Sequence, residues 1–397
     1  MNENGPFGAR FVTGITGLQR HPGGSAGAAM SSPSFALTAV EQKQATNPLG
    51  LVRIDHIQLT GSIQKLEGLY RRLGFARVAS GAVQGGRCVH LKQQRMDILV
   101  FECDETHPAG RYFKAHDEGA CALNFEVEDL DAAIAGARSR GAKVVLEPEA
   151  HALGDGTLRF AAIQGVGDVW NYLIERKGEL GAFWPGLAAD PAPAACDPGL
   201  VRIDHLTNNV GPKEMDALVD FYERVYGFVV TREFHIRGAL GTGLDSKVVQ
   251  SSNNRVIIPI NEPTDEKSQV QEYVNRHKGQ GIQHIALSTN DIEATLRTLY
   301  EQGFKFMRVP DTYYELLPGR IAKGGYTVRE DLDTAKELGI QIDGDGTGYL
   351  LQIFTEDQIG PLFFEIIQRR GNMGFGEGNF QALYDSIELD QKRRGVL

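Results

Sequence analysis

Two histidines and one glutamate in the second half of the chain belong to residue types that bind metal ions. His205 stands in RIDHL, His284 in GIQHIALS and Glu365 in PLFFEIIQR, and each segment is expected to be a strand. If the first two strands pair and the third lies beside one of them, the three side chains converge in one cavity. Two neutral imidazoles and one carboxylate form the ligand set of non-haem Fe(II) oxygenases, because it leaves positions open for substrate and oxygen. The sequence therefore predicts a metal site in the second half.

The strands expected to carry these ligands belong to an internal repeat. The heptapeptide GLVRIDH occurs at 50–56 and again at 199–205. Each copy is followed by a segment with helical apolar spacing, residues 62–75 and 212–228, which ends in Gly-Phe where the helix should stop. The two halves are therefore expected to share one fold.

Within each half the pattern starts a second time. Residues 121–145 parallel residues 283–307, in an alignment that places Asp129 on Asp291. The chain thus contains four similar units of the βαβββ type, each too small to bury its own apolar face. We therefore predict an α+β fold of two domains, each an open barrel of mixed, curved sheet, with a C-terminal lid helix.

Composition indicates where these domains begin and end. Residues 1–48 are rich in Gly, Ala, Ser, Thr and Pro, which predicts a mobile N-terminal tail, with a short docked piece around 35–40. Residues 49–178 form the degenerate first domain, and the Pro- and Gly-rich stretch 179–199 is interpreted as the linker. Residues 200–397 form the catalytic domain.

The first half lacks the partners of its repeated histidine. His56 matches His205, but the positions of the other two predicted ligands fall on Ala122 and Tyr172. Neither side chain can replace the missing ligand. We therefore expect no catalytic metal in the first half and interpret His56 as a packed structural histidine.

Charge and composition exclude several classes of function. The chain has a net charge of −10, which argues against a nucleic-acid surface. No stretch approaches the roughly 18 apolar residues of a membrane span. The four cysteines have no metal-type spacing and are too few for a disulfide scaffold, so we expect reduced thiols in a cytoplasmic protein.

From residue 200 onward the motifs resemble the 4-hydroxyphenylpyruvate dioxygenase family of the vicinal-oxygen-chelate superfamily. The segments that carry the resemblance are RIDHLTNNV, VIIPINEP, KSQVQEY, GQGIQHIALSTNDI, GYLLQIFT, FFEIIQRRG and GFGEGNFQALYDSIELDQKRRGVL. The first half resembles the degenerate N-terminal domain of that family. The resemblance implies an Fe(II)-dependent enzyme of tyrosine and phenylalanine catabolism. Its reaction would convert 4-hydroxyphenylpyruvate and O2 to homogentisate and CO2 by oxidative decarboxylation, ring hydroxylation and side-chain migration.

The resemblance also implies roles for individual residues. His205, His284 and Glu365 match the Fe(II) ligands. Residues that match the catalytic amides are Gln269, Gln352 and Asn261. Residues that match the substrate pocket are Ser246, Asn261, Gln269, Gln283, Gln352, Phe354, Phe375, Asn379 and Phe380. Because an ideal strand points Gln283 and His284 to opposite faces, Gln283 needs a twist or bulge to reach the pocket.

The C-terminal segment shows the residue pattern of a helix preceded by a glycine-rich stretch. Phe380 and Leu383 lie on one helical stripe, with Asn379 as the expected N-cap. The glycines in GFGEG predict a flexible hinge for a lid that excludes water. An ordinary C-terminal helix packed on the core is the alternative.

Three other functions share parts of this pattern. The nearest is that of a 4-hydroxymandelate synthase, which hydroxylates the benzylic carbon of the same substrate; Pro259, Asn261 and Asn379 match the dioxygenase type instead. A non-catalytic binding module of the same superfamily would lack the His–His–Glu set. A Zn or Ni lyase-type enzyme or an extradiol dioxygenase would lack the pocket glutamines and the lid. The expected partners are 4-hydroxyphenylpyruvate, O2 and further copies of the chain in a homo-oligomer.

Overall fold

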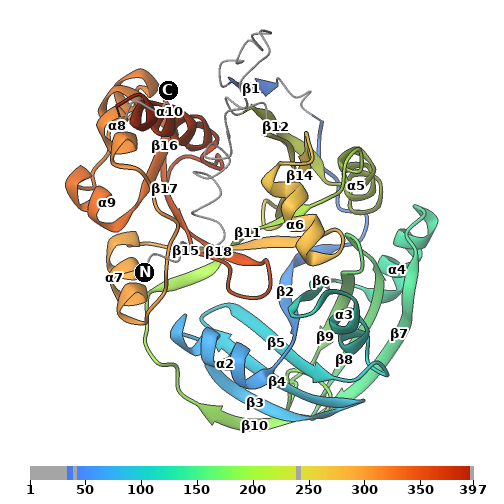
Figure 1. Ribbon diagram of the computed structural model, residues 1–397. Helices are drawn as coiled ribbons and strands as arrows, with labels where there is room; N and C mark the ends of the chain where they lie inside the picture. Colours follow the sequence, from blue (N-terminus) through green and yellow to red (C-terminus); the bar gives the residue numbers. More distant parts are fainter. Residues whose placement is uncertain (1–33, 39–42, 238–242, 394–397) are drawn as a thin grey trace, which may run out of the picture.

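The computed structural model describes residues 34–38, 43–237 and 243–393, which are organised around two nine-stranded sheets (Figure 1). The order in the first sheet is β10 (Leu187–Ala192), β3 (Ala76–Val83), β4 (Gly86–Gln93), β5 (Met96–Cys103), β2 (Leu51–Thr60), β6 (Gly119–Val127), β9 (Trp170–Lys177), β8 (Gly156–Gln164) and β7 (Val144–Leu153). The order in the second sheet is β1 (Ser34–Thr38), β12 (Val229–Arg237), β13 (Gly243–Gln250), β14 (Ile257–Pro263), β11 (Leu200–Asn209), β15 (Gly281–Thr289), β18 (Phe363–Arg370), β17 (Gly348–Phe354) and β16 (Gln341–Asp345). The two orders are the same once β2 is matched to β11, so the repeated sequence is a repeated fold, as predicted.

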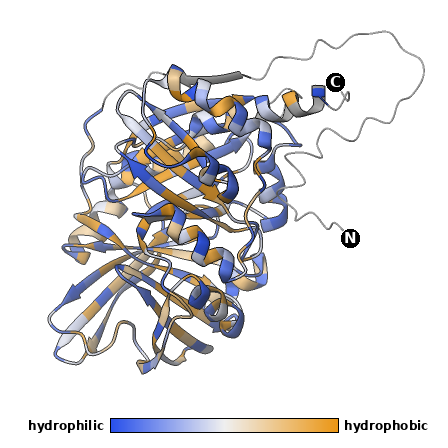
Figure 2. Cartoon of the chain, turned by 90° about the vertical axis from the view of Figure 1, so that its left-hand side faces the viewer, coloured by the Kyte–Doolittle hydropathy of each residue, from blue (hydrophilic) through white to orange (hydrophobic). Residues whose placement is uncertain are grey.

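Helices, with one exception, cover the outer faces of both curved sheets (Figure 1). They are α2 (Ile63–Arg72), α3 (Pro108–His116), α4 (Leu130–Ser139), α5 (Met215–Phe221) with the π-helix η1 (Tyr222–Tyr226), α6 (Gln269–His277), α7 (Ile292–Glu301), α8 (Asp311–Gly324), α9 (Leu332–Leu338) and α10 (Glu377–Arg393). The exception is α10, which packs against α8 and the edge strand β16. Figure 2 shows hydrophobic residues gathered on the strands and hydrophilic residues on the outer sides of the helices. None of the described helices is long and apolar enough to cross a membrane.

The aligned aspartates and glycines begin and end equivalent helices. Asp129 and Asp291 are the N-caps of α4 and α7, and each side chain accepts a hydrogen bond from the backbone N–H three residues later, at 3.0 and 3.1 Å. Gly141 and Gly303 follow these helices with the same positive φ of 77°. Capping chemistry therefore explains why these positions recur in both halves.

The predicted linker and the predicted docked piece of the N-terminal tail contribute edge strands. The linker 179–199 contains β10, which pairs with β3, and the tail 1–48 contains β1, which pairs with β12. Both strands are antiparallel additions at the same edge of their sheets. An edge strand has only one hydrogen-bonded neighbour, so a segment of low hydrophobicity can form it without a strong sequence pattern. The exact domain boundaries stay a prediction.

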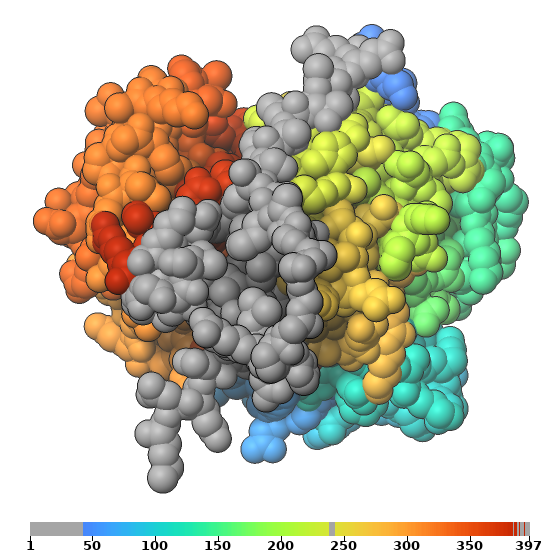
Figure 3. Space-filling view, turned by 45° about the horizontal axis from the view of Figure 1, so that its top comes forward, coloured from blue at the N-terminus to red at the C-terminus, as the bar shows by residue number. Residues whose placement is uncertain are grey.

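The second half contains two helices that have no counterpart in the first. α8 and α9 lie between α7 and β16, whereas α4 leads directly into β7. In Figure 3 the segment of α8 and α9 and the segment of β12 and α5 lie on opposite sides of the face shown. α8 packs against the C-terminal helix α10, with the Thr312 hydroxyl donating to the Ser386 carbonyl at 2.7 Å. The internal repeat gave no signal for these helices.

Two stacked histidines join the halves. The rings of His116 in α3 and His277 in α6 lie 4.5 Å apart with an angle of 13° between their planes. The Tyr112 hydroxyl lies 2.7 Å from His277 Nε2, and His116 Nδ1 donates to the His277 carbonyl at 2.8 Å. The end of α6 is therefore fixed against the first half of the molecule.

Candidate metal centre and substrate cavity

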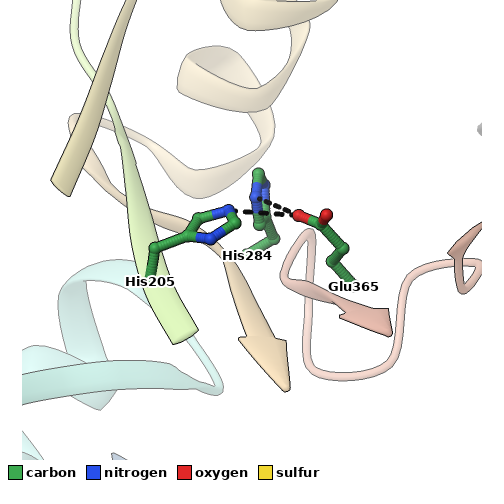
Figure 4. A group of neighbouring side chains, drawn as sticks. All are labelled: His205, His284 and Glu365. Atoms are coloured by element: carbon green, nitrogen blue, oxygen red, sulfur yellow. Dashed lines mark ion pairs between the residues drawn. The ribbon is translucent and has the colours of Figure 1, made fainter. Parts of the chain in front are cut away.

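The central strands of the second sheet bring the three predicted ligands together. β15 pairs with β11 on one side and with β18 on the other, as the sequence predicted. Ala286 of β15 is in register with both His205 and Glu365, and His284 lies two residues before Ala286. The three ligand side chains therefore share one face of the sheet. Figure 4 shows them pointing toward one another from three different strands, and all three are buried.

The geometry of this group fits a divalent cation. Glu365 Oε2 lies 3.1 Å from His205 Nε2 and 3.4 Å from His284 Nε2, and one ligand atom of each residue lies within 4.8 Å of the other two. Burial alone would raise the pKa of Glu365 and lower that of His205, but their mutual attraction reverses both directions. Glu365 Oε1 is buried and has no hydrogen-bond partner in the part of the chain that the structure describes. The group thus stabilises positive charge and keeps a carboxylate oxygen free for a metal.

Hydrogen bonds behind the histidines set their tautomers. His205 Nδ1 donates to Asp204 Oδ1 at 2.9 Å, and His284 Nδ1 lies 3.0 Å from Gln283 Oε1. Burial opposes ionisation of Asp204, but hydrogen bonds and charge from His205 and Arg369 hold its pKa well below its usual range. Because Nδ1 carries a proton in both rings, Nε2 is the nitrogen that each ring can offer to a metal; His284 Nε2 also lies 2.9 Å from the Thr207 hydroxyl in this structure.

A β-bulge explains how Gln283 and its neighbour both reach the cavity. Thr207 pairs with His284, but the next residue of β11, Asn208, pairs with Ile282. Gln283 is therefore the extra residue in β15, and the strict alternation of the two faces is interrupted there. The irregularity that the sequence required at this position is present in the structure.

The first sheet shows the same registers with different residues. Asn124 of β6 pairs with both His56 and Tyr172, as Ala286 pairs with the two ligands in the second sheet. Ala122, two residues earlier in β6, stands where the second sheet has His284. The structure therefore places Ala122 and Tyr172 at the positions that the sequence alignment gave them. The His56 imidazole Nδ1 lies 2.7 Å from Asp55 Oδ2.

Aromatic side chains fill the space in front of His56. Phe183 packs edge-on against the imidazole at 5.3 Å, and Trp184 does so at 5.4 Å. Trp184 also stacks on Phe160 at 4.8 Å. Both residues come from the segment that the sequence interpreted as a linker, so that segment also packs against His56 inside the first sheet.

A cavity of ≈ 840 Å³, including its open mouth, lies beside His284. Residues predicted for the substrate pocket that line it are Asn261, Gln269, Gln283, Gln352, Phe354, Asn379 and Phe380. Lining residues that the sequence did not predict are Leu244, Met307, Arg308, Val309, Pro310, Gln341, Phe363 and Leu383. Two predicted pocket residues lie outside this lining. Ser246 is buried opposite Asn261 in the β13–β14 pair, and the Phe375 ring packs edge-on against His205 at 5.2 Å.

Several amide atoms of the cavity have no hydrogen-bond partner among the described residues. Both polar atoms of the Gln352 side chain are buried and unpaired, as are Gln341 Oε1 and Asn379 Nδ2. Buried polar groups are nearly always paired in native proteins, because an unpaired one carries its full desolvation cost. These amides are therefore suited to bind the polar groups of a ligand in a cavity that also has aromatic walls.

Comparisons with known proteins agree with this arrangement. Residues 45–185 match the family model described as "Hydroxyphenylpyruvate dioxygenase, HPPD, N-terminal", and residues 202–317 match that of the "Glyoxalase/Bleomycin resistance protein/Dioxygenase superfamily". The 4-hydroxyphenylpyruvate dioxygenase of Pseudomonas aeruginosa is 41% identical over 369 residues, which cover 91% of this chain and 100% of that protein. This chain belongs to the 4-hydroxyphenylpyruvate dioxygenase family.

Other relatives extend the comparison. The 4-hydroxyphenylpyruvate dioxygenase of Caenorhabditis elegans is 37% identical, and the match covers 87% of this chain and 93% of that protein. A triple mutant of 4-hydroxymandelate synthase from Streptomyces coelicolor has a TM-score of 0.73 at 25% identity and covers 86% of this chain and 99% of that chain. The chain is therefore an enzyme of the dioxygenase class, as the resemblance implied.

In this member of the 4-hydroxyphenylpyruvate dioxygenase family, Asn379 is not the N-cap that the sequence predicted. α10 begins at Glu377, so Asn379 lies inside its first turn. The Asn379 Oδ1 atom accepts hydrogen bonds from the Tyr313 hydroxyl at 2.6 Å and from Arg320 Nη2 at 3.0 Å. These two residues of α8 therefore turn the NH2 group of Asn379 toward the cavity. They were missed because α8 has no counterpart in the repeat.

Gly376, just before α10, and Gly378, in its first turn, are sites of close packing. A Cβ on Gly376, whose φ is +71°, would lie 2.1 Å from Gln352 Nε2. A Cβ on Gly378 would lie 2.3 Å from Asp343 Oδ1, and its backbone N–H donates to the same carboxylate at 2.8 Å. The predicted hinge is thus a tightly packed loop in this structure, and glycine is needed there because side chains approach the backbone.

Proposed function

We propose that this enzyme binds Fe(II) through His205, His284 and Glu365 and converts 4-hydroxyphenylpyruvate and O2 to homogentisate and CO2. The observation that carries the proposal is the position of the His–His–Glu group beside a cavity of unpaired buried amides and aromatic rings. The 37–41% identity to proteins that bear this activity in their names supports the same conclusion. The product belongs to the catabolism of tyrosine and phenylalanine.

Fe(II) is the metal that the ligand set favours. Two neutral imidazoles and one carboxylate on one side of the ion leave cis positions open for exogenous ligands, which a structural zinc site with four protein ligands does not do. Fe(II) bound there would supply the O2 chemistry and the chelation of the 2-oxo acid. Asp204 and Gln283 serve this chemistry by holding the histidine Nε2 atoms toward the ion.

The cavity side chains bind and orient the substrate. We assign the hydrogen bonds to its polar groups to Gln269, Gln352 and Asn261, and the contact with its ring to Phe354 and Phe380. Both polar atoms of the Gln352 side chain are fully buried, so its hydrogen bond to a ligand is made without competition from water. These residues fix which substrate carbon faces the metal.

Four further pocket assignments extend the same proposal. Gln283 and Asn379 present NH2 groups to the cavity, because their amide oxygens are occupied by His284 and by the α8 residues. Ser246 and Phe375 act from just outside the lining, through Asn261 and His205 respectively. Water is excluded from the reacting groups by α10, which contributes Phe380 and Leu383 to the cavity wall.

Benzylic hydroxylation to 4-hydroxymandelate is the second candidate, because a 4-hydroxymandelate synthase shares the fold at a TM-score of 0.73. Its lower identity, 25% against 41% for the bacterial dioxygenase, favours homogentisate. Incubation of the Fe(II)-loaded enzyme with 4-hydroxyphenylpyruvate and O2, followed by chromatography of the products, decides between them. Homogentisate with equimolar CO2 supports the proposal, and 4-hydroxymandelate contradicts it. Absence of oxygen uptake would instead favour a binding module.

The expected context of the enzyme is also a proposal. The substrate and O2 are its small-molecule partners, and the acidic net charge of −10 disfavours nucleic acid as a partner. All four cysteines are unpaired thiols, which suits a reducing compartment such as the cytoplasm. A homo-oligomer is the expected state, and light scattering of the purified enzyme measures it directly.

A further inference from the structure

Arg369, near the end of β18, contacts both the partner of a metal ligand and the C-terminal segment. Its Nε and Nη2 atoms donate to the Asp204 carboxylate at 3.0 and 2.7 Å, and Asp204 accepts from His205 Nδ1 at 2.9 Å. Its Nη1 atom donates to the carbonyl oxygens of Gly374 at 2.6 Å and Asn372 at 3.2 Å. One guanidinium thus uses all three of its nitrogens to join two parts of the second half.

Phe375 provides a second connection between the same parts. Its ring packs edge-on against the His205 imidazole at 5.2 Å and lies 5.6 Å from the guanidinium carbon of Arg369. Residues 372–380, called here the closing segment, therefore touch the metal ligand and the arginine behind it. The closing segment also carries Asn379 and Phe380 of the cavity wall.

We propose that Arg369 is a positioning residue that links the orientation of His205 to closure of the closing segment over the cavity. The inference rests on the proposed metal site. The Arg369 side chain is 9% exposed and the Asp204 side chain 2%, so both hydrogen-bonded contacts are shielded from water. Without the guanidinium, Asp204 keeps only a longer contact of 3.5 Å with Arg202 as its arginine partner, and the two backbone carbonyls lose their donor at the same time.

The coupling between metal binding at His205 and closure of the closing segment is reciprocal. If a metal held by His205 favours the closed segment, then the closed segment favours the metal by the same free energy. Arg369 is the residue through which this coupling passes, because it alone bonds to both Asp204 and the carbonyls of the closing segment among the described residues. A lysine at this position can bind Asp204 as a point charge, but it lacks the fork that reaches both partners at once.

The first half provides a matched control. Arg176 donates to Asp55 at 3.0 and 2.7 Å and to the Phe183 carbonyl at 3.0 Å, and it lies 4.2 Å from the centre of the Phe183 ring. Asp55 in turn bonds to His56, which has no second histidine or glutamate beside it among the described residues. Arg176→Gln therefore removes the same set of interactions at a place where the metal site is absent.

Hydrogen exchange of the backbone amides in 373–380 tests the proposal without turnover. The amide of Gly378 donates to Asp343 at 2.8 Å, outside the closing segment, whereas the amides of Phe375 and Asn379 donate within it, to Glu377 at 3.0 Å and Gly376 at 2.9 Å. Opening of the closing segment breaks the first bond and brings water to the other two. Exchange is measured for the full-length wild type, Arg369→Gln, Arg369→Lys and Arg176→Gln, each metal-free and with anaerobic Fe(II). The affinity for Fe(II) is measured on the same samples.

In the wild type, Fe(II) should slow exchange of these three amides. Arg369→Gln should abolish that metal-dependent slowing and weaken Fe(II) binding by about 10- to 100-fold. Arg369→Lys should recover part of the affinity but not the slowing, and Arg176→Gln should keep both. The proposal is overturned if Arg369→Gln retains the slowing, or if Arg176→Gln loses it equally. These exchange and binding measurements contain no substrate. Failure of the wild type to form homogentisate would therefore contradict the proposed function without affecting the test of the link through Arg369.

Discussion

His56 and His205 occupy the same position in the two sheets and have the same hydrogen bond, 2.7 and 2.9 Å long, to the aspartate that precedes each of them. The repeated RIDH motif is thus explained by a buried Asp–His pair that each half also joins to an arginine. What distinguishes the two histidines is the residue facing Nε2. His205 faces a carboxylate at 3.1 Å, whereas His56 faces the amide of Gln58 at 3.3 Å.

Replacement of a site residue by alanine should therefore have different effects in the two halves. Glu365→Ala should abolish turnover and iron binding, because it removes the one anionic ligand. His56→Ala should retain both, while costing about 1–3 kcal/mol of stability, since Asp55 loses a buried partner. Iron content per chain and urea unfolding of both variants measure these effects. Equal loss of iron from the two variants would show that the metal site is not confined to the second half.

The hydroxyl of Tyr313 should matter for substrate binding. Tyr313→Phe removes a donor to Asn379 Oδ1 and should raise KM roughly 3- to 10-fold, because the amide is no longer held toward the cavity. Tyr314→Phe is the control, since the neighbouring hydroxyl is buried and no described residue forms a hydrogen bond with it. Steady-state kinetics of both variants check this. Similar KM values for the two would argue against the role given to Tyr313.

The space at Gly376 should be essential for the cavity. Gly376→Ala places a methyl group 2.1 Å from Gln352 Nε2 at a φ of +71° and should cost about 1–3 kcal/mol while lowering kcat/KM. The control is Gly319→Ala inside α8, where a Cβ would meet nothing within 4 Å. That change should be neutral or stabilising by up to about 1 kcal/mol. Thermal unfolding and kinetics are the measurements, and unchanged kinetics for Gly376→Ala would contradict the close approach.

The Asp55–Arg176 pair should make stability sensitive to acid. Burial opposes ionisation of Asp55, but hydrogen bonds and charge from His56 and Arg176 hold its pKa well below the ordinary 3.8. Because the folded state binds the proton more weakly than the unfolded state, this contribution is present in full above about pH 5 and is lost as pH falls through the acid range. Asp55→Asn should therefore reduce the fall in the free energy of unfolding between neutral and acid pH. Urea titrations at several pH values test this, and identical slopes for the variant and the wild type would refute it.

Local features account for what the sequence predicted well. The repeat, the capping aspartates Asp129 and Asp291 and the strands of the three ligands all depend on residue types within short windows. The pairing of those strands was a condition of the predicted site, and the structure meets it. Such features are determined by residues close to one another in the sequence, and the His–His–Glu group could be predicted from them.

Contacts between distant segments account for what was missed. Tyr313 and Arg320 contact Asn379 from a helix that only the second half contains. Phe183 and Trp184 pack on His56 from a stretch that looks like a linker. Nothing in the composition of these segments indicates which distant surface they will cover. The prediction of Asn379 as the N-cap is also wrong, because α10 begins at Glu377 and Asn379 lies inside its first turn.

Anaerobic titration of the metal-free enzyme with Fe(II) in the presence of 4-hydroxyphenylpyruvate, followed by admission of O2 and analysis of the product, tests the central claim most directly. The account predicts one iron bound per chain and conversion of the bound substrate to homogentisate and CO2. Two irons per chain, or 4-hydroxymandelate as the product, would contradict it.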